Sequence, residues 1–419
     1  MSSIKAFPRH SVVLSKDTLK AIAQAIKENG IIEGKDLQHF ESEFSRYIGV
    51  KYAQGASSAR FLLYLALKAL HIQDGDEIIL PAYTFYALPL IIKLFGAKPL
   101  FVDVDERTYN INTSLIEEKI TKRSRAILIT HMFGQPCEMD SICSIARSYN
   151  LKIIEDCAHA CGAKYRNRKV GSFGDVALFS FQMGKNLPCF GGGMAVTNDK
   201  AIYENIKWSL SDYRYPSPIN LFKKVFSTYL IYLSTRKYLF PYLIYPFLRL
   251  FDLFNFDLSD RVLTEKIYSL PLPDLFKMQG RLANLQAKVG LAQLNSLDVF
   301  NEKTRQNAEL LTRELKEAKN IFLPFIIPEA VSTFLHYRIK VNDPIRFRGE
   351  LIERGIDTKK DDMTACSSLE IFRDSNYMPC PVAEGLPSKS IEIPNNPFLN
   401  ERDILYIAEQ VWEVSKELT

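Results

Sequence analysis

Three apolar runs between Leu151 and Asp199 each end in a polar residue or a glycine. The runs cover residues 152–154, 176–181 and 194–197, and each has the length of a buried strand. Buried strands of this kind carry side chains to a site at their ends. The groups placed there are a carboxylate, an imidazole, a hydroxyl and an amine, on Asp156, His159, Ser180 and Lys185. The chain therefore needs a fold that brings these strand ends together.

The same four groups suggest a cofactor. One lysine beside a glycine run, with an acid, a histidine and a serine nearby, fits pyridoxal 5'-phosphate (PLP) better than other common cofactors. The lysine amine bonds to the PLP aldehyde, and the acid keeps the pyridine nitrogen protonated. Two simpler interpretations stay open, because Lys185 also fits a solvated lysine and Asp156 also fits a helix N-cap.

Strand-like runs alternate with helical patterns in the first half of the chain. The strands are expected at 77–80, 99–102, 126–130 and 152–154, and the helices at 87–94, 114–120 and 139–148. This alternation predicts an α/β domain with a mostly parallel sheet and a ligand site at the carboxyl ends of its strands. The polar or aromatic residues that fall at such ends are Tyr83, His131, Asp156 and Ser180.

A serine-rich turn at residues 54–58 opens an apolar helix that is expected over residues 61–70. The first N–H groups of a helix are unpaired and lie at the positive end of its dipole, which suits an anion. Capping of the helix by Ser58 explains the same pattern and is the more common case.

Composition excludes several classes of protein. The 419 residues are enough for two domains, and a net charge of +5 over that length does not indicate a nucleic-acid partner. The seven cysteines have no framework spacing, so a reducing compartment is expected. Residues 1–8 lack the apolar core of a signal peptide, which makes a cytoplasmic location the default expectation.

The motifs together resemble the PLP-dependent aminotransferases that act on keto-sugar nucleotides, the DegT/DnrJ/StrS family. The resemblance covers roughly two thirds of the chain and is carried by residues 34–44, 75–85, 96–105, 131–136, 155–163, 179–187, 280–294 and, more weakly, 353–356. It implies the aspartate-aminotransferase-like α/β fold (PLP fold type I). A large domain would span residues 1–300 and a smaller C-terminal α+β domain residues 301–419. It also implies a homodimer.

The resemblance implies a role for each residue. Lys185 would hold the cofactor covalently and move the proton, and Asp156 would pair with the pyridinium nitrogen. Ser180 would hold the phosphate. His159 would lie near the ring's 3-oxygen, or merely pack beside the cofactor. Tyr83 or Phe85 would stack on the ring, although either aromatic also fits the core.

Three departures from the family pattern affect these roles. The chain reads Ser58-Ala59-Arg60 where the family has Ser-Gly-Thr, so Arg60 either grips the phosphate or points to solvent. Gln279 replaces an asparagine that reaches the phosphate of the partner subunit's cofactor, and is a weaker candidate for that contact. Residues 357–362 replace a segment that touches substrate in relatives.

An insertion at about residues 213–276 is the largest departure. Two aromatic and apolar runs, 225–235 and 238–248, are bracketed by lysines and arginines. Each run has eleven residues, short of the roughly twenty needed to cross a bilayer, and two prolines oppose one long helix. This composition favours a segment of about 219–256 that lies on a membrane surface. A subunit interface or a cap over the active site is the alternative.

The expected activity is transfer of an amino group, with glutamate as the implied donor, to a keto-sugar that is expected to be linked to a nucleotide. Cell-envelope or surface-glycan biosynthesis, at the cytoplasmic face of the membrane, is the expected setting. The alternatives are a lipid-linked keto substrate, or a PLP-binding regulatory or scaffold protein without turnover. No metal is expected, because Cys157, His159 and Cys161 lack a fourth ligand nearby.

Overall fold

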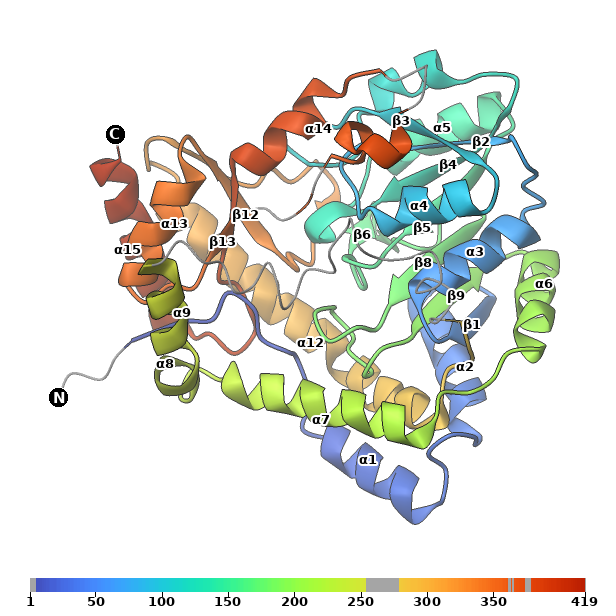
Figure 1. The fold of residues 1–419 in the computed structure, drawn as a ribbon, viewed down its shortest axis with the longest axis horizontal. Coiled ribbons are helices and arrows are strands. Elements are labelled where there is room, and N and C mark those ends of the chain that lie inside the picture. The colour runs from blue at the N-terminus through green and yellow to red at the C-terminus, as the bar shows by residue number, and fades with distance from the viewer. Residues whose placement is uncertain (1–4, 254–278, 361–362, 364, 374–377, 419) are drawn as a thin grey trace.

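The computed structural model describes residues 5–253, 279–360, 363, 365–373 and 378–418. Figure 1 shows a large lobe built on a twisted sheet, a smaller lobe that contains the C-terminus, and one long helix that runs between them. Part of the predicted insertion, residues 254–276, lies outside the described residues.

The large lobe is organised around a seven-stranded sheet. Its strands follow in the order β1 (Tyr52–Ala56), β9 (Gly193–Thr197), β8 (Val176–Ser180), β5 (Lys152–Asp156), β4 (Ser124–Thr130), β2 (Glu77–Pro81) and β3 (Lys98–Val102). The pairings from β8 to β3 are parallel, whereas β9 and β1 are antiparallel to their neighbours. This confirms the prediction of a mostly parallel α/β sheet.

Helices cover both faces of this sheet, which explains why the middle of each central strand is apolar on both faces. The helices are α2 (Asp36–Ile48), α3 (Ala59–Ala69), α4 (Ala87–Leu94), α5 (Met139–Ser148) and α6 (Lys200–Ser211). Side chains alternate along β2, so Ile78 and Leu80 join the core beneath α3, and Ile79 joins the core on the opposite face. Both cores hold the strand ends in place.

The prediction of a helix at residues 114–120 is wrong. The segment forms two 3-10 turns, η1 (Thr113–Leu115) and η2 (Glu117–Lys119). Ile116 between them is fully buried, but no residue within either turn is. A single buried side chain supplies too little packing to hold a short α-helix.

The smaller lobe has a four-stranded antiparallel sheet in the order β10 (Ile321–Phe322), β12 (Tyr337–Val341), β14 (Ser390–Ile393) and β13 (Lys359–Lys360). Helices α13 (Pro344–Glu353) and α15 (Glu401–Glu417) pack on it. Helix α12 (Asn284–Glu314) enters this lobe from the large one, so it crosses the predicted domain boundary at residue 300 without a break. The division of the chain there stays a prediction.

Short elements complete the described chain. A three-stranded sheet joins β11 (Ala330–Val331), β6 (Lys164–Tyr165) and β7 (Arg168–Lys169). The remaining short helices are η3 (Met132–Gly134), η4 (Cys366–Ser368), η5 (Glu370–Phe372), α14 (Pro381–Gly385) and η6 (Leu386–Ser388).

The described part of the insertion is helical. It forms α7 (Pro218–Ser234), α8 (Phe240–Leu243) and α9 (Tyr245–Leu253), with α1 (Thr18–Lys27) near α7 along one edge of the molecule (Figure 1). The prolines at 241 and 246 begin separate short helices, as expected. Within the described ranges, none of the helices combines the length and the hydropathy that a bilayer-crossing segment needs.

Helices α2 and α12 approach each other closely at Gly290. A Cβ atom built on Gly290 would lie 2.4 Å from the Phe40 ring, which is fully buried. We therefore predict that Gly290→Ala lowers the free energy of unfolding by about 1–3 kcal/mol, although alanine normally favours a helix.

Gly385→Ala is the matched control, because a Cβ there would meet no atom within 4 Å. Denaturant unfolding followed by circular dichroism would measure both variants. Equal or greater stability of Gly290→Ala would contradict the close packing of α2 against α12.

Candidate active site

Three strands of the parallel sheet deliver polar side chains to one edge. Asp156 ends β5, Ser180 ends the neighbouring strand β8, and His131 follows β4. Asp156 is 6% exposed, and its Oδ1 accepts a hydrogen bond of 3.0 Å from the N–H of Ala158. Burial raises the pKa of Asp156, whereas that N–H and the charge of Lys185 lower it. The carboxylate therefore both caps the turn after β5 and lies within electrostatic reach of Lys185.

The residue before Asp156 anchors this edge. Glu155 is fully buried and accepts backbone N–H bonds of 2.7–2.8 Å from Gly171, Phe173 and Gly174. His131 Nδ1 accepts the N–H of Cys137, so its Nε2 carries the proton and donates to Glu155 at 3.1 Å. Burial alone would raise the pKa of Glu155, but these bonds hold it below its ordinary value.

Lys185 lies in the turn that follows β8. Its N–H donates to the carbonyl of Gln182 at 3.1 Å. A Cβ atom on the preceding Gly184 would come within 3.0 Å of His10 Nε2, so the N-terminal segment packs closely against this turn. Burial lowers the pKa of His159 and of His10, and the charge of Lys185 contributes to both shifts, so the amine lies within electrostatic reach of both imidazoles.

The start of α3 reaches the same edge through the glycine run after Lys185. Ser58 pairs with Gly192, and Ser180 pairs with Gly193 across β8 and β9. A Cβ on Gly193 would lie 2.6 Å from the N–H nitrogen of Ala59, so only glycine leaves room there. Ser58 Oγ caps α3 by accepting the N–H of Phe61 at 3.2 Å. Capping is thus shown, and the first turn of α3 also lies beside Ser180.

The structure separates the two aromatic candidates. Tyr83 is fully buried in a core that includes Tyr109 and Phe133. Phe85 is 37% exposed, and the guanidinium of Arg60 lies 5.9 Å from its ring centre. Phe85 is therefore the aromatic that can meet a ligand, and Arg60 extends over it from the first turn of α3.

Gln279 begins the described chain after the insertion and is partly exposed. The carbonyl of Gly280 accepts the N–H of Ser57 at 2.9 Å, and Arg281 pairs with Ala56. Gln279 thus lies next to the segment that leads into α3 of its own chain.

His159 belongs to a group of aromatic rings that the sequence did not reveal. Its ring lies 6.1 Å from Phe133, nearly parallel, and 5.4 Å from His336. Burial lowers the pKa of His159 well below its usual value, and Lys185 lowers it further, so the imidazole is neutral. Its Nδ1 has no hydrogen-bond partner among the described residues.

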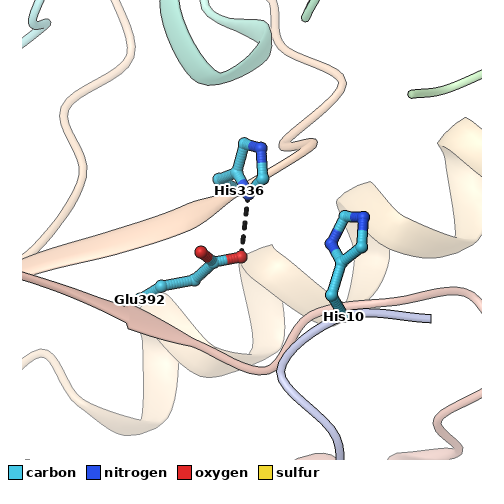
Figure 2. Close-up of side chains that lie close together, drawn as sticks. All are labelled: His10, His336 and Glu392. Atoms are coloured by element: carbon cyan, nitrogen blue, oxygen red, sulfur yellow. Dashed lines mark hydrogen bonds and ion pairs between the residues drawn. The ribbon is translucent and has the colours of Figure 1, made fainter. Parts of the chain in front are cut away.

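The smaller lobe supplies the other side of this group. Figure 2 shows His10, from the N-terminal segment, beside His336 and Glu392, whose side chains are joined by a 2.8 Å hydrogen bond. Burial lowers the pKa of His10 to about 4. Glu392 also pairs with Arg338 at 3.3 Å, and the Arg338 guanidinium lies 4.9 Å from the Phe133 ring.

Sequence reasoning missed these four residues, because His10 is hundreds of residues away from its partners and the small-lobe strands are short. The altered stretch 357–362 lies next to them. Thr358 Oγ1 donates to the carbonyl of Glu392, and Asp357 accepts the N–H of Arg9 at 3.2 Å. Residues 361–362 lie outside the described residues.

Two groups have ligand atoms close enough to hold a metal ion. In the first, His10, His336 and Glu392 have such atoms within 4.8 Å of one another, but the Arg338 guanidinium already neutralises that carboxylate. In the second, Cys157 joins His131 and Glu155, whose hydrogen bonds are described above. The sequence paired Cys157 with His159 instead. Neither arrangement favours a cation, and the absence of a metal stays a prediction.

The chain resembles known proteins in both sequence and fold. The sequence profile of the DegT/DnrJ/EryC1/StrS aminotransferase family matches residues 13–217 and 251–412. The chain belongs to this family. The family match leaves out residues 218–250, which include α7, α8 and the start of α9.

Individual relatives match nearly the whole chain. It is 30% identical over 393 residues to a GDP-perosamine synthase of Escherichia coli O157:H7, covering 91% of this chain and 90% of that protein. It is 31% identical over 400 residues to the dTDP-3-amino-3,6-dideoxy-alpha-D-galactopyranose transaminase of Aneurinibacillus thermoaerophilus, covering 94% of each. The crystal structure of S. venezuelae DesV in complex with a ketimine intermediate superposes with a TM-score of 0.76, 27% identity and coverage of 98% and 99%.

Members of the family are PLP-dependent, so this protein is a PLP-dependent aminotransferase of fold type I, as the sequence predicted. Two structural features fit the cofactor. The buried Nδ1 of His159 has no hydrogen-bond partner among the described residues and lies within electrostatic reach of Lys185, and the glycine at 193 lets the first turn of α3 pack closely against β8. We expect Lys185 to hold PLP covalently, Asp156 to face its ring nitrogen, and the start of α3 with Ser180 to hold its phosphate.

A cavity of about 530 Å³ lies between α2, β1 and α6. Glu41 lines it and accepts hydrogen bonds of 2.8 Å from Gln54 Nε2 and from the N–H of Gly55. Burial raises the pKa of Glu41 to about 7, although the Gly55 bond opposes that shift. Arg281, Lys207 and Lys51 line the same cavity.

We predict that Asp156→Asn weakens PLP binding by roughly 10- to 100-fold, because a hydrogen bond to a charged group contributes about 1.5–3 kcal/mol. Titration of the PLP-free protein, followed by visible absorbance, would measure the affinity. Asp175→Asn is the control, since Asp175 bonds Lys152 and Ile153 at the opposite edge of the sheet. Equal losses in both variants would contradict the assigned role.

A second prediction concerns pH. The pKa of Glu41 is raised in the folded protein, so the unfolded chain binds fewer protons above pH 4.5, and stability falls as pH rises toward and through 7. Glutamine cannot titrate, so Glu41→Gln removes this pH dependence. Between pH 5 and 8 the free energy of unfolding of the variant should therefore fall by up to about 3 kcal/mol less than that of the native chain. Urea unfolding at several pH values would show it. The exposed Glu204→Gln should behave like the native chain, and parallel curves for Glu41→Gln would refute the buried titration.

Proposed function

We propose that this protein transfers an amino group from glutamate to the ketone of a nucleotide-linked sugar, in the biosynthesis of a cell-envelope or surface glycan. The observation that carries the proposal is the convergence of Lys185, Asp156, Ser180 and the start of α3 at one edge of the sheet. The chain resembles sugar-nucleotide transaminases over more than nine tenths of its length, which supports this substrate class.

Each residue then has a definite task. Bound PLP supplies the electron sink for charge at the substrate carbon. Lys185 takes and returns the proton at that carbon, and Asp156 keeps the ring nitrogen protonated. His159 is neutral, so it can accept or donate a hydrogen bond beside the ring without repelling Lys185. The group of buried Arg338, buried Glu392 and partly buried His336 approaches this site from the smaller lobe, through the contact of the His336 ring with His159.

We also propose a homodimer. The resemblance to the family supports it, because the residue at the position of Gln279 reaches the partner subunit's cofactor in relatives. The partly exposed Gln279 fits such a contact, since it lies at the surface beside the segment that leads into α3. Glutamate as the donor rests on the family resemblance alone.

A second candidate function is amination of a lipid-linked keto substrate by an enzyme at the cytoplasmic face of the membrane. The observation that favours it is the set of exposed apolar side chains on α7, α8 and α9. Both candidates share the chemistry at Lys185 and differ in the carrier of the sugar.

We predict that the purified protein aminates a keto-sugar nucleotide with glutamate as donor, and that Lys185→Ala abolishes both this turnover and the visible absorbance of covalently held PLP. Lys122→Ala, at the opposite edge of the sheet, should leave both unchanged. A panel of keto-sugar nucleotides and lipid-linked keto-sugars, with product analysis by mass spectrometry, would identify the acceptor.

Two outcomes would contradict the proposal. Turnover by Lys185→Ala at the native rate would remove the central role of this lysine. PLP binding without turnover on any acceptor, and without amino transfer from glutamate to the cofactor, would indicate a regulatory or scaffold protein instead.

A further inference from the structure

Helix α7 carries an exposed apolar stripe. The stripe consists of Ile219, Phe222, Phe226, Leu230 and Leu233, which are 40–73% exposed. Their spacing of three and four residues places them on one side of the helix. Five large apolar side chains in one row are far more than the isolated exposed residues that normal surfaces contain.

The opposite side of α7 is firmly attached to the large lobe. Leu221 and Thr228 are buried, and Tyr229 packs against Phe190 with ring centres 5.9 Å apart. Leu221 shares a core with residues of α1 and α12. Helix α7 is therefore apolar on two sides, and only one of these sides packs against the large lobe.

The exposed surface continues over α8 and α9. Tyr238, Tyr242, Phe247 and Leu250 are 50–75% exposed. Beneath them, Tyr245 is buried and donates its hydroxyl to the carbonyl of Ile352 on α13 at 2.7 Å. Figure 1 shows α7 along the large lobe and α9 beside α13 of the smaller lobe, so exposed apolar side chains of the insertion occur on both lobes. We call the exposed side chains of α7, α8 and α9 the α7–α9 face.

The charge of this region has a single sign. Residues 213–251 contain no aspartate or glutamate and six basic residues, Arg214, Lys223, Lys224, Arg236, Lys237 and Arg249. Lys223 and Arg249 are exposed, whereas Lys237 pairs with Asp403 and Arg236 stacks on Phe398. A chain that is 24% charged overall has thus lost every acidic side chain here.

The family match does not include most of the α7–α9 segment. Residues 218–250 lie outside the family match, so the α7–α9 face is an addition to the catalytic fold. It therefore serves some purpose other than the common chemistry of the family.

We propose that the α7–α9 face binds the surface of a bilayer that contains anionic phospholipid, with α7 lying parallel to the membrane plane. Aromatic and aliphatic side chains would enter the interface, and lysines and arginines would meet the phosphate groups. A symmetric contact between two copies is disfavoured, because it would bring two mostly basic surfaces together, with Asp252 near the end of α9 as the one acidic residue in the range 213–253. The inference deepens the second candidate function, which places the enzyme at the cytoplasmic face of the membrane.

The test is flotation of the full-length, PLP-loaded protein with vesicles. Vesicles of phosphatidylglycerol and phosphatidylcholine should carry the native protein upward, and phosphatidylcholine alone should carry much less. The double variant Phe226→Glu/Leu230→Glu should reduce binding at least about tenfold, since two apolar side chains no longer leave water. Higher salt and Lys223→Glu/Arg249→Glu should also weaken binding.

Val299→Glu is the matched control, because Val299 is 68% exposed on α12 and lies outside the α7–α9 face. Circular dichroism and the visible absorbance of PLP would confirm that each variant is folded and loaded. Failure of the native protein to float, or an equal loss in Val299→Glu, would overturn the inference. A lower mass of the double variant in light scattering, with no vesicle binding by the native protein, would assign the face to a second copy instead.

The two proposals fail in different ways. Glutamate-dependent turnover of a soluble keto-sugar nucleotide should be the same in the double variant and the native protein. Vesicle binding without any turnover would refute the proposed function and leave the membrane face intact. Turnover without vesicle binding would refute the membrane-binding role of the α7–α9 face and leave the proposed function intact.

Discussion

The buried carboxylate of Glu155 is the contact on which the site depends. It joins three parts of the chain, since it accepts bonds from His131 after β4 and from three backbone N–H groups between β7 and β8. An unpaired carboxylate at that depth would be costly, so the four donors must stay in place. The adjacent residue on β5 is Asp156, and the strand that follows the donor loop leads to Ser180 and Lys185. Satisfying one buried acid therefore positions the groups that face PLP.

Close backbone packing at two glycines then brings α3 and the N-terminal segment to the site. Gly193 allows the first turn of α3 to approach Ser180, and Gly184 allows His10 to approach the Lys185 turn. These contacts join segments that are more than a hundred residues apart. The smaller lobe adds Arg338, Glu392 and His336, held together by ion pairs and hydrogen bonds in a buried setting. The surroundings of Lys185, which is itself partly exposed, therefore include several charged and polar side chains from both lobes.

The order of strands and helices was predictable because each strand is a short apolar run with a polar end. The element that failed has little local signal. Residues 113–119 hold one buried isoleucine and form 3-10 turns. The domain division at residue 300 stays a prediction, and α12 runs through that position. Tyr83 and Phe85 look equivalent in the sequence, yet one is enclosed by the core and the other faces Arg60.

By itself, the sequence determined the α/β fold, the PLP cofactor and the candidate residues Asp156, Ser180 and Lys185, because these lie at strand ends whose position follows from local apolar patterns. It also determined the basic, aromatic composition of residues 213–251. The tertiary structure alone decided that His10, His336 and Glu392 meet, since they come from three distant segments. It also decided which side of α7 is exposed, because both sides are apolar and only packing against Phe190 distinguishes them.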